Sequence, residues 1–265
     1  MTTPLPLTIE KGLALRRRLA TGDKLLGAWS TLGSTHVAAL MAHAGYDFLL
    51  VDLEHGQGGI DTVAAQVQAV LALPTAIVVR CPDHSTATLK RVLDAGANAV
   101  LLPMVDTVEQ ARAIVAACRY APQGARGVAI GAIPASDYGY RAESYFEHAN
   151  AATTIVVQIE TPAAVQAATA IADVDGIDGF FIGPNDLSAA MGLYRRYDDP
   201  LFVQALDRVE AAAKAAGRIL GALPYPQRGW QQLFAAGHQL VPATSDQMLL
   251  RQGSLALVDA HRRPA

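Results

Sequence analysis

Short apolar segments alternate with longer amphipathic segments along the whole chain. The apolar segments are rich in Val, Ile, Leu or Phe at consecutive positions, so both faces of each would be hydrophobic. This pattern is typical of parallel strands that are covered on both sides. It predicts strands over residues 24–30, 47–53, 75–81, 98–105, 154–160, 179–184, 218–224 and 238–244.

The amphipathic and Ala-rich segments between these strands have the spacing of helices. Several begin with Ser, Thr or Asp, and Gly96 and Gly217 follow the ends of two of them, as expected at helix termini. Helices are predicted over residues 62–73, 85–96, 107–120, 162–174 and 200–217.

Eight strands alternating with helices in about 250 residues predict an α/β fold of the (β/α)8, or TIM, barrel type. A doubly wound open sheet is the alternative. That fold would place a G-x-G-x-x-G phosphate loop after its first strand, and the chain has none there. The glycines between Gly56 and Gly59 have the wrong spacing for such a loop and are interpreted as a flexible turn.

The length and composition indicate one large domain over residues 1–265. The chain is 51% hydrophobic and 17% charged, which favours a sizeable core over disorder. A formal net charge of -3 provides no basic field for nucleic acid. There is no secretory signal and no apolar stretch of about 18 residues, so we expect no membrane partner and a cytoplasmic location. The two cysteines, Cys81 and Cys118, suit a reducing compartment.

One region departs from the regular alternation. Residues 120–152 are too long for a plain helix-to-strand connection, and they are predicted to be an insertion in the single domain.

Polar residues gather where the predicted strands end. In a (β/α)8 barrel the carboxyl ends of the strands form the functional face, so these side chains are the candidates for chemistry. Nothing comparable occurs at the amino ends of the strands. The candidates are Asp52, Glu54, His55, Arg80, Gln158, Glu160, Asn185 and Asp186.

Glu160 and Asp186 follow neighbouring strands, and two carboxylates there would repel one another unless they shared a cation or a proton. Mg²⁺ or Mn²⁺ would meet this need with one or two carboxylates, water and substrate oxygens. No His or Cys lies beside either acid, which argues against zinc. In the structural alternative, Asp186 is a helix N-cap and Glu160 a surface acid or ion-pair partner. The occurrence of both acids at adjacent strand ends favours the metal interpretation.

His55 and Arg80 each have a catalytic and a structural interpretation. Asp52 lies three residues before His55, close enough to orient one ring nitrogen and make the imidazole a general base. Arg80 suits the binding of a carboxylate or enolate oxygen, or a structural salt bridge. A Schiff-base mechanism is disfavoured because it needs a lysine at a strand end. The lysines lie in helical or leading segments, at Lys11, Lys24, Lys90 and Lys214.

Six sequence motifs occur together in order: "VDLEHG", "VVRCP", "VLDAGANAVLLPMV", "RGVAIG", "VQIET" and "FFIGPNDLS". From about Leu26 to the C-terminal helix, the chain resembles the HpcH/HpaI family of class II pyruvate aldolases. The resemblance implies a (β/α)8 barrel of the phosphoenolpyruvate/pyruvate type. It also implies reversible cleavage of 4-hydroxy-2-oxo acids to pyruvate and an aldehyde, with Mg²⁺, Mn²⁺ or Co²⁺ as the cofactor.

The resemblance implies a role for each matching residue. Glu160 and Asp186 would bind the metal, and Arg80 would contact the keto oxygen. His55 with Asp52 would manage protons, and Asp94 would belong to the same proton network. Four further residues would line the pyruvate carboxylate: Gln158, Gly183, Pro184 and Asn185.

The sequence leaves alternatives for the substrate, for the oligomeric state and for the function itself. The segments after His55 and after "RGVAIG" offer no arginine for a distal carboxylate except Arg141, so a short hydroxy-aldehyde product is as well supported as a dicarboxylic substrate. The family commonly forms trimers and hexamers with exchanged C-terminal helices. The predicted helix over 245–263 fits such an exchange or simple closure of the barrel. Two other functions remain as alternatives: a coenzyme A-ester lyase of the citrate lyase β-subunit type, and a non-catalytic barrel that binds 2-oxo acids.

Overall fold

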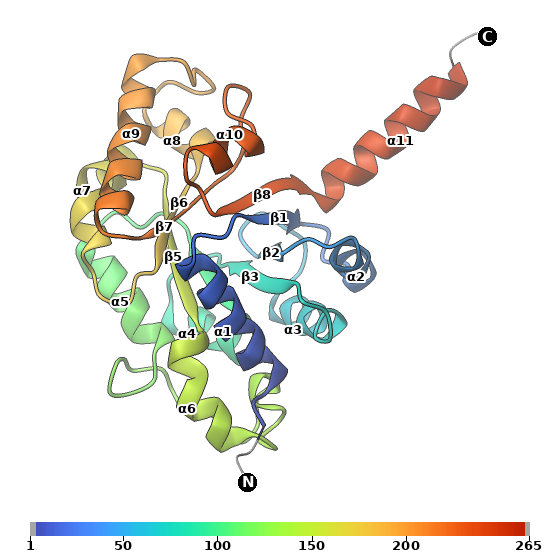
Figure 1. Ribbon diagram of the computed structural model, residues 1–265, viewed down its shortest axis with the longest axis vertical. Helices are drawn as coiled ribbons and strands as arrows, with labels where there is room; N and C mark the ends of the chain where they lie inside the picture. The colour runs from blue at the N-terminus through green and yellow to red at the C-terminus, as the bar shows by residue number, and fades with distance from the viewer. Residues whose placement is uncertain (1–3, 263–265) are drawn as a thin grey trace.

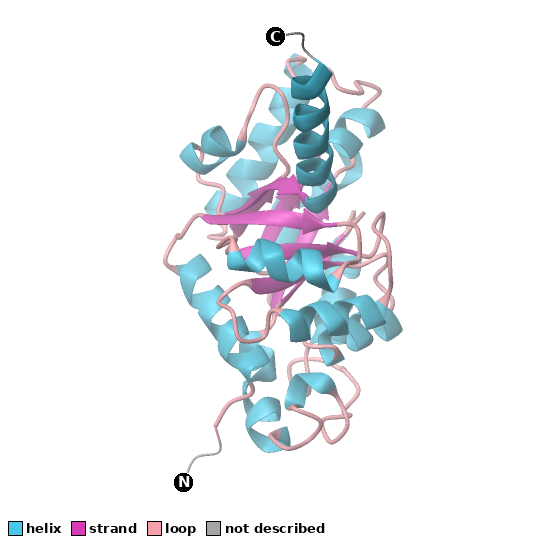
Figure 2. Ribbon diagram, turned by 90° about the vertical axis from the view of Figure 1, so that its right-hand side faces the viewer, coloured by secondary structure: helices cyan, strands magenta, loops and turns pink. Residues whose placement is uncertain are grey.

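Eight parallel strands close into a barrel in the computed structural model, which describes residues 4–262 (Figures 1 and 2). The strands pair in chain order, and β1 pairs with β8 to complete the barrel. All eight predicted strands are confirmed, and so is the (β/α)8 fold class. Their bounds are β1 Leu25–Ser30, β2 Phe48–Asp52, β3 Ala76–Arg80, β4 Ala99–Leu102, β5 Thr154–Ile159, β6 Gly179–Ile182, β7 Ile219–Ala222 and β8 Leu240–Ser245.

The five predicted helices are also present, and helices pack around the outside of the barrel (Figure 1). Gly96 and Gly217 follow two of them with φ of 105° and 63°, the left-handed conformation that glycine permits at a helix end. No helix within residues 4–262 is long and apolar enough to cross a membrane. The helices are α1 Leu7–Ala20, α2 Thr35–His43, α3 Ile60–Ala69, α4 Thr86–Asp94, α5 Val108–Cys118, η1 Pro134–Ser136, α6 Ala142–Ala152, α7 Pro162–Ala172, α8 Pro184–Ala190, α9 Pro200–Ala215, α10 Trp230–Ala235 and α11 Asp246–Arg262.

The two-residue periodicity of the strands creates two hydrophobic cores. Alternate residues such as Leu49 and Val79 point outward and pack against the helices. Their neighbours, among them Leu50, Val78 and Val156, fill the inside of the barrel. Because side chains alternate along a strand, residues two or four positions after these interior residues also face the inside of the barrel, at its carboxyl end. This register positions the polar residues described below.

The segment of 120–152 lies at the amino-terminal end of the barrel, together with α1. Leu15 and Leu19 of α1 join the interior core and close that end. Residues of η1 and α6, including Ile133 and Tyr145, form a small separate core against Ile9 of α1. The insertion therefore covers the end of the barrel that lies opposite the strand ends where the polar candidates gather.

The C-terminal helix α11 does not fold back onto the barrel, and the interpretation that it closes the barrel is wrong. Figure 1 shows it projecting away from the other helices, and Asp246 is its one buried residue. The Asp246 carboxylate accepts hydrogen bonds from the backbone N–H groups of Thr31 and Leu32 at 3.0 Å, which fixes the start of the helix at the end of β1. Residues 1–3 and 263–265 of the expected single domain lie outside the described residues.

Candidate active site

Strand register brings the polar candidates to one end of the barrel. Asp52 and Arg80 each lie two residues beyond an interior residue, Leu50 and Val78, and they are direct partners across β2 and β3. Gln158 and Glu160 follow the interior residue Val156 by two and four positions on β5 and just beyond it. All four side chains therefore face the inside of the barrel at its carboxyl end, the functional face of this fold.

Glu160 is a buried carboxylate without a cationic partner. It is 3% exposed, and within residues 4–262 no arginine, lysine or histidine forms an ion pair with it. Its Oε1 accepts a hydrogen bond from the backbone N–H of Met104 at 2.7 Å, and its Oε2 accepts from Gln158 Nε2. Burial raises the pKa of Glu160 above its ordinary value, and Asp186 and Glu54 raise it further, while the two hydrogen bonds act in the opposite direction. The surface-acid interpretation of Glu160 is excluded.

Asp186 is not a helix cap. It is the third residue of α8, whose N-cap is Gly183, and it lies close enough for its charge to raise the pKa of Glu160. The strand register explains the proximity, since Ile159 and Ile182 are partners and Glu160 and Gly183 directly follow them. A Cβ atom on Gly183 would lie 2.9 Å from Glu160 Oε2, so a larger residue here would displace that carboxylate oxygen.

The residues at this position fit a hard divalent cation. The ligands available are carboxylate oxygens, which Mg²⁺ and Mn²⁺ prefer. The Oε1 atom of Gln158 is buried without a hydrogen-bond partner, so an acceptor beside Glu160 is left for a bound ligand or water to satisfy. Over the described part of the chain no three His, Cys, Asp or Glu side chains form a metal-ligating group. Two carboxylates would thus leave the other coordination positions to water and substrate.

The guanidinium of Arg80 contacts three side chains, those of Asp52, Glu54 and Trp29. Its Nε and Nη2 donate to the two oxygens of Asp52 at 2.9 and 2.7 Å, and its Nη1 lies 2.9 Å from Glu54 Oε2. The guanidinium also lies over the ring of Trp29, 4.5 Å from the centroid. Burial raises the pKa of Asp52, but the hydrogen bonds and charge of Arg80 outweigh this effect and hold that pKa below its ordinary value. Asp52 therefore stays ionised and keeps Arg80 in a fixed orientation.

His55 is exposed beyond the end of β2. Its backbone N–H donates to Asp52 Oδ1 at 3.2 Å, and the N–H of Glu54 donates to the same oxygen at 3.0 Å. The expectation that Asp52 orients a ring nitrogen of His55 differs from this geometry, because the carboxylate of Asp52 is engaged by Arg80 and by the backbone. Asp52 instead shapes the turn that carries His55.

Three of the expected carboxylate-binding residues begin α8. Gly183 is the N-cap, and Pro184 and Asn185 form the first turn. Asn185 is exposed, and its Oδ1 accepts a hydrogen bond from the hydroxyl of Tyr197, a buried residue that follows α8. The side-chain amide nitrogen of Asn185 is left available to a ligand.

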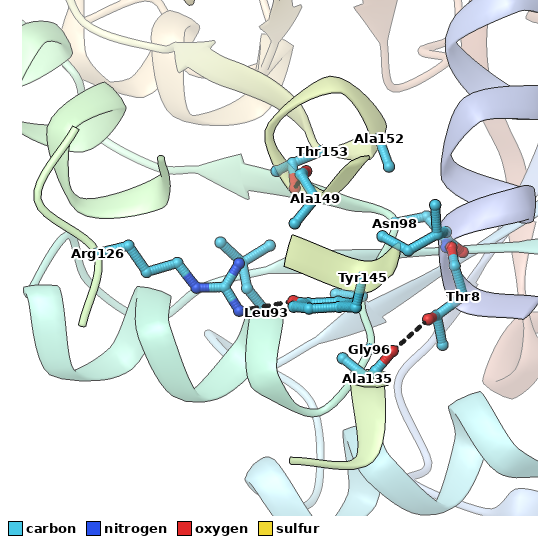
Figure 3. Close-up of a pocket in the computed structure, with 12 residues that line it drawn as sticks. Thr8, Leu93, Gly96, Asn98, Arg126, Ala135, Tyr145, Ala149, Ala152 and Thr153 are labelled. Atoms are coloured by element: carbon cyan, nitrogen blue, oxygen red, sulfur yellow. Dashed lines mark hydrogen bonds between the residues drawn. The ribbon is translucent and has the colours of Figure 1, made fainter. Parts of the chain in front are cut away.

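Asp94 lies at the opposite end of the barrel, so within one chain it is not brought to the candidate site. It is the last residue of α4, which runs from the carboxyl ends of the strands back to their amino ends. Its Oδ1 accepts a hydrogen bond from Arg126 Nη2 at 2.6 Å, and Arg126 also donates to the hydroxyl of Tyr145. Figure 3 shows Arg126 and Tyr145 at a cavity of about 20 Å³ there. Within one chain Asp94 is held by Arg126, and its expected role in the proton network stays a prediction.

Two features of the site escaped the sequence analysis. Trp29 is the second-last residue of β1 and supports Arg80, and the aromatic residue near a strand end was the available signal. The backbone of Met104 donates to Glu160 from a left-handed conformation, with φ of 52°. No sequence signal marks this second feature, because a non-glycine residue with positive φ is uncommon.

The closed barrel and the charged residues at its carboxyl end define the class as a (β/α)8-barrel enzyme. The HpcH/HpaI aldolase/citrate lyase family model matches residues 25–253, and the chain belongs to that family.

Similar proteins agree with this assignment. The chain is 37% identical over 237 residues to 2-keto-3-deoxy-L-rhamnonate aldolase of Klebsiella pneumoniae, covering 89% of this chain and 88% of that one. It is 38% identical over 244 residues to 4-hydroxy-2-oxo-heptane-1,7-dioate aldolase of Salmonella dublin, covering 92% of both. A crystal structure of an HpcH/HpaI aldolase/citrate lyase family protein from Burkholderia cenocepacia superposes with a TM-score of 0.89 at 35% identity, covering 94% of this chain and 99% of that one.

Proposed function

We propose that this chain is a divalent-metal-dependent aldolase that reversibly cleaves 4-hydroxy-2-oxo acids to pyruvate and an aldehyde. One observation carries the metal dependence: the Glu160 carboxylate is buried, the exposed Asp186 lies close enough for its charge to raise the pKa of Glu160, and within residues 4–262 no cationic side chain forms an ion pair with either acid. A buried carboxylate without a cation is costly, so it is retained where a bound cation compensates it. The aldolase names of two relatives support the reaction.

Glu160 and Asp186 would hold the metal. When bound, a divalent cation supplies Lewis-acid stabilisation of the negative charge that develops on the keto oxygen. Mg²⁺, Mn²⁺ and Co²⁺ are the candidates, since all accept carboxylate oxygens.

The chain's own residues divide the remaining work. Arg80 is fixed by Asp52 and Glu54, and it would donate hydrogen bonds to the keto oxygen, where negative charge appears as the C3–C4 bond breaks. His55, on the turn shaped by Asp52, would accept the proton of the C4 hydroxyl as the aldehyde forms. Gln158, Asn185 and the backbone at Gly183 and Pro184 would orient the carboxylate of the 2-oxo acid.

A short hydroxy-aldehyde is the proposed second product. Arg141, the one arginine considered for a distal carboxylate, lies at the amino-terminal end of the barrel, where it donates to the carbonyl of Leu5 at 2.7 Å and pairs with Asp137. Within one chain it is therefore far from the candidate site. A screen that compares 4-hydroxy-2-oxo acids of equal length with and without a terminal carboxylate tests this proposal, and a clear preference for the dicarboxylic compound would contradict it.

Chelation provides the direct test of the proposed function. We expect the purified protein to release pyruvate and glycolaldehyde from 4,5-dihydroxy-2-oxopentanoate, to lose this activity in EDTA, and to regain it when Mn²⁺ or Mg²⁺ is added in excess. A coupled assay that reduces the released pyruvate measures each state. Full activity in EDTA after removal of tightly bound metal would exclude the metal role, and no turnover under any condition would favour a binding protein.

The exposed apolar surface of α11 supports a proposed homo-oligomer, a trimer or hexamer in which this helix packs on another copy. Leu250 and Leu257 are 64% and 75% exposed, and Met248, Leu249, Leu255 and Val258 are exposed beside them. Apolar surface of this kind marks an interaction site. The free, buried thiols of Cys81 and Cys118 fit the proposed cytoplasmic location.

Replacing Leu250 and Leu257 with aspartate is expected to reduce the oligomer to a smaller species, because two charges would be buried in the contact. Light scattering after size exclusion measures the mass. The matched control is Leu40→Asp on α2, since Leu40 is 70% exposed on another helix. An unchanged mass for the double variant would contradict the proposed contact.

A further inference from the structure

The imidazole of His84 contacts the carbonyl oxygen of Pro103. His84 lies in the loop between β3 and α4, next to Ser85, the N-cap of α4, and its Nε2 is the contacting atom. Pro103 follows β4 and is buried. Apart from His84, no donor among the turns, loops and side chains of residues 4–262 forms a hydrogen bond with the carbonyl oxygen of Pro103. A carbonyl oxygen can only accept a hydrogen bond, so the Nε2 atom of His84 must carry the proton.

The same peptide group contacts Glu160 at its other end. The carbonyl of Pro103 and the N–H of Met104 belong to one peptide bond, and they point in opposite directions because that bond is trans. The Met104 N–H donates to Glu160 Oε1 at 2.7 Å. A single peptide group is therefore held between His84 and Glu160.

The conformation of Met104 shows why this peptide needs to be held. Its φ of 52° is in the left-handed region, which side chains other than glycine rarely adopt. Residues held in such conformations gather at functional sites, where the surrounding contacts maintain them. Without the contact from His84, the peptide could rotate toward a relaxed conformation and turn its N–H away from Glu160. A hydrogen bond to the carbonyl also polarises the peptide and strengthens its N–H as a donor.

We propose that His84 is a positioning residue for the metal site: it fixes the Pro103–Met104 peptide so that the Met104 N–H orients the Glu160 carboxylate toward the cation. The cation part of this inference rests on the proposed function. His84 would act through this one peptide group and not as a ligand of the metal. Contacts that orient metal ligands are typically worth 10- to 100-fold in metal affinity.

Three variants separate this role from a general structural one. His84→Leu removes the donor, whereas His84→Gln places an amide nitrogen the same number of bonds from the backbone and retains it. His43→Leu is the matched control, because His43 is exposed at the end of α2. We expect the Mn²⁺ dissociation constant, measured by calorimetry on metal-free protein, to rise about tenfold in His84→Leu and to change by no more than about twofold in the other two variants.

A second measurement needs no metal. The chain contains 5 methionines, so ¹⁵N-methionine labelling gives a simple amide spectrum in which Met104→Leu identifies the Met104 signal. Loss of the polarising contact is expected to move this signal upfield in His84→Leu, and His84→Gln should restore its position.

The outcomes are distinguishable. An unmoved Met104 signal in folded His84→Leu would overturn the role of His84 whatever the metal does. A moved signal with wild-type Mn²⁺ affinity would show that the contact does not serve the metal site. Failure of the wild-type protein to bind Mn²⁺ would overturn the proposed function together with the cation part of this inference, while the amide signal would still decide whether His84 holds the peptide.

Discussion

Replacing Glu160 with glutamine is expected to lower kcat/KM for retro-aldol cleavage by about 1,000-fold or more and to abolish Mn²⁺ binding. Glutamine has nearly the same volume and can still accept the hydrogen bond from Met104 through its Oε1 atom. Its amide nitrogen would replace the oxygen that accepts from Gln158, and the Gln158 amide can turn over to present its unpartnered Oε1, so the main change is the loss of one negative charge. Loss of the cation would remove several kcal/mol of stabilisation of charge in the transition state. Steady-state kinetics and calorimetric titration with Mn²⁺ measure the two losses.

The same substitution is expected to leave the metal-free protein at least as stable as the wild type. Burial raises the pKa of Glu160 because the charged form is poorly solvated, and glutamine is neutral. The control is Glu147→Gln on α6, since Glu147 is exposed and lies at the other end of the barrel. A Glu160→Gln enzyme with normal turnover and normal Mn²⁺ affinity would contradict the assignment of Glu160 as a ligand.

Replacing Arg80 with lysine is expected to lower kcat/KM by about 100- to 1,000-fold, the usual effect of removing one preorganised donor to a developing oxyanion. Lysine keeps the charge, but it cannot bind both oxygens of Asp52 and also reach Glu54. Its ammonium group would also stack less favourably on Trp29. Both the binding and the orientation of the keto oxygen should suffer.

The effect of Arg80→Lys should appear in kcat as well as in KM, because the interaction strengthens as charge develops. Arg91→Lys is the matched control, since Arg91 is exposed on α4, directly after the strand that ends in Arg80. Kinetic constants of Arg80→Lys equal to those of the wild type would show that Arg80 is only a structural partner of Asp52.

The strands could be predicted because a strand that is buried on both faces needs apolar residues at nearly every position. Segments such as Phe48–Asp52 and Ala76–Arg80 are buried at every position, and a continuous apolar run records that burial. The alternation of strands and helices also showed which charged residues follow a strand. Because parallel strands in a barrel all end on one face, Arg80 and Glu160 could be placed at the carboxyl end of the barrel.

Contacts between different loops could not be predicted in the same way. Asp52 was assigned to His55 because the two are close in sequence, but Arg80 is its partner across the sheet, 28 residues further on. Asp94 was placed in the proton network by resemblance, and the direction of α4 carries it to the opposite end of its own barrel, a position that its spacing in the sequence did not indicate. The left-handed conformation of Met104 depends on the contacts around it, so the identity of the residue does not predict it.

The C-terminal helix shows a different limit. Its amphipathic pattern indicates that one face is covered, but it does not specify what covers it. A helix that closes its own barrel and a helix that packs on another copy require the same pattern, and only the course of the chain after Asp246 separates them.

The central claim is that the carboxylates of Glu160 and Asp186 hold a divalent cation that carries the 2-oxo acid. A crystal structure of the protein with Mn²⁺ and pyruvate tests it most directly, because the anomalous signal of Mn²⁺ locates the ion independently of the chain. We expect one peak about 2.1–2.2 Å from an oxygen of each carboxylate, with the carboxylate and keto oxygens of pyruvate and water completing the coordination and Arg80 beside the keto oxygen. A Mn²⁺ peak away from these two side chains, or pyruvate bound there without the ion, would contradict the account.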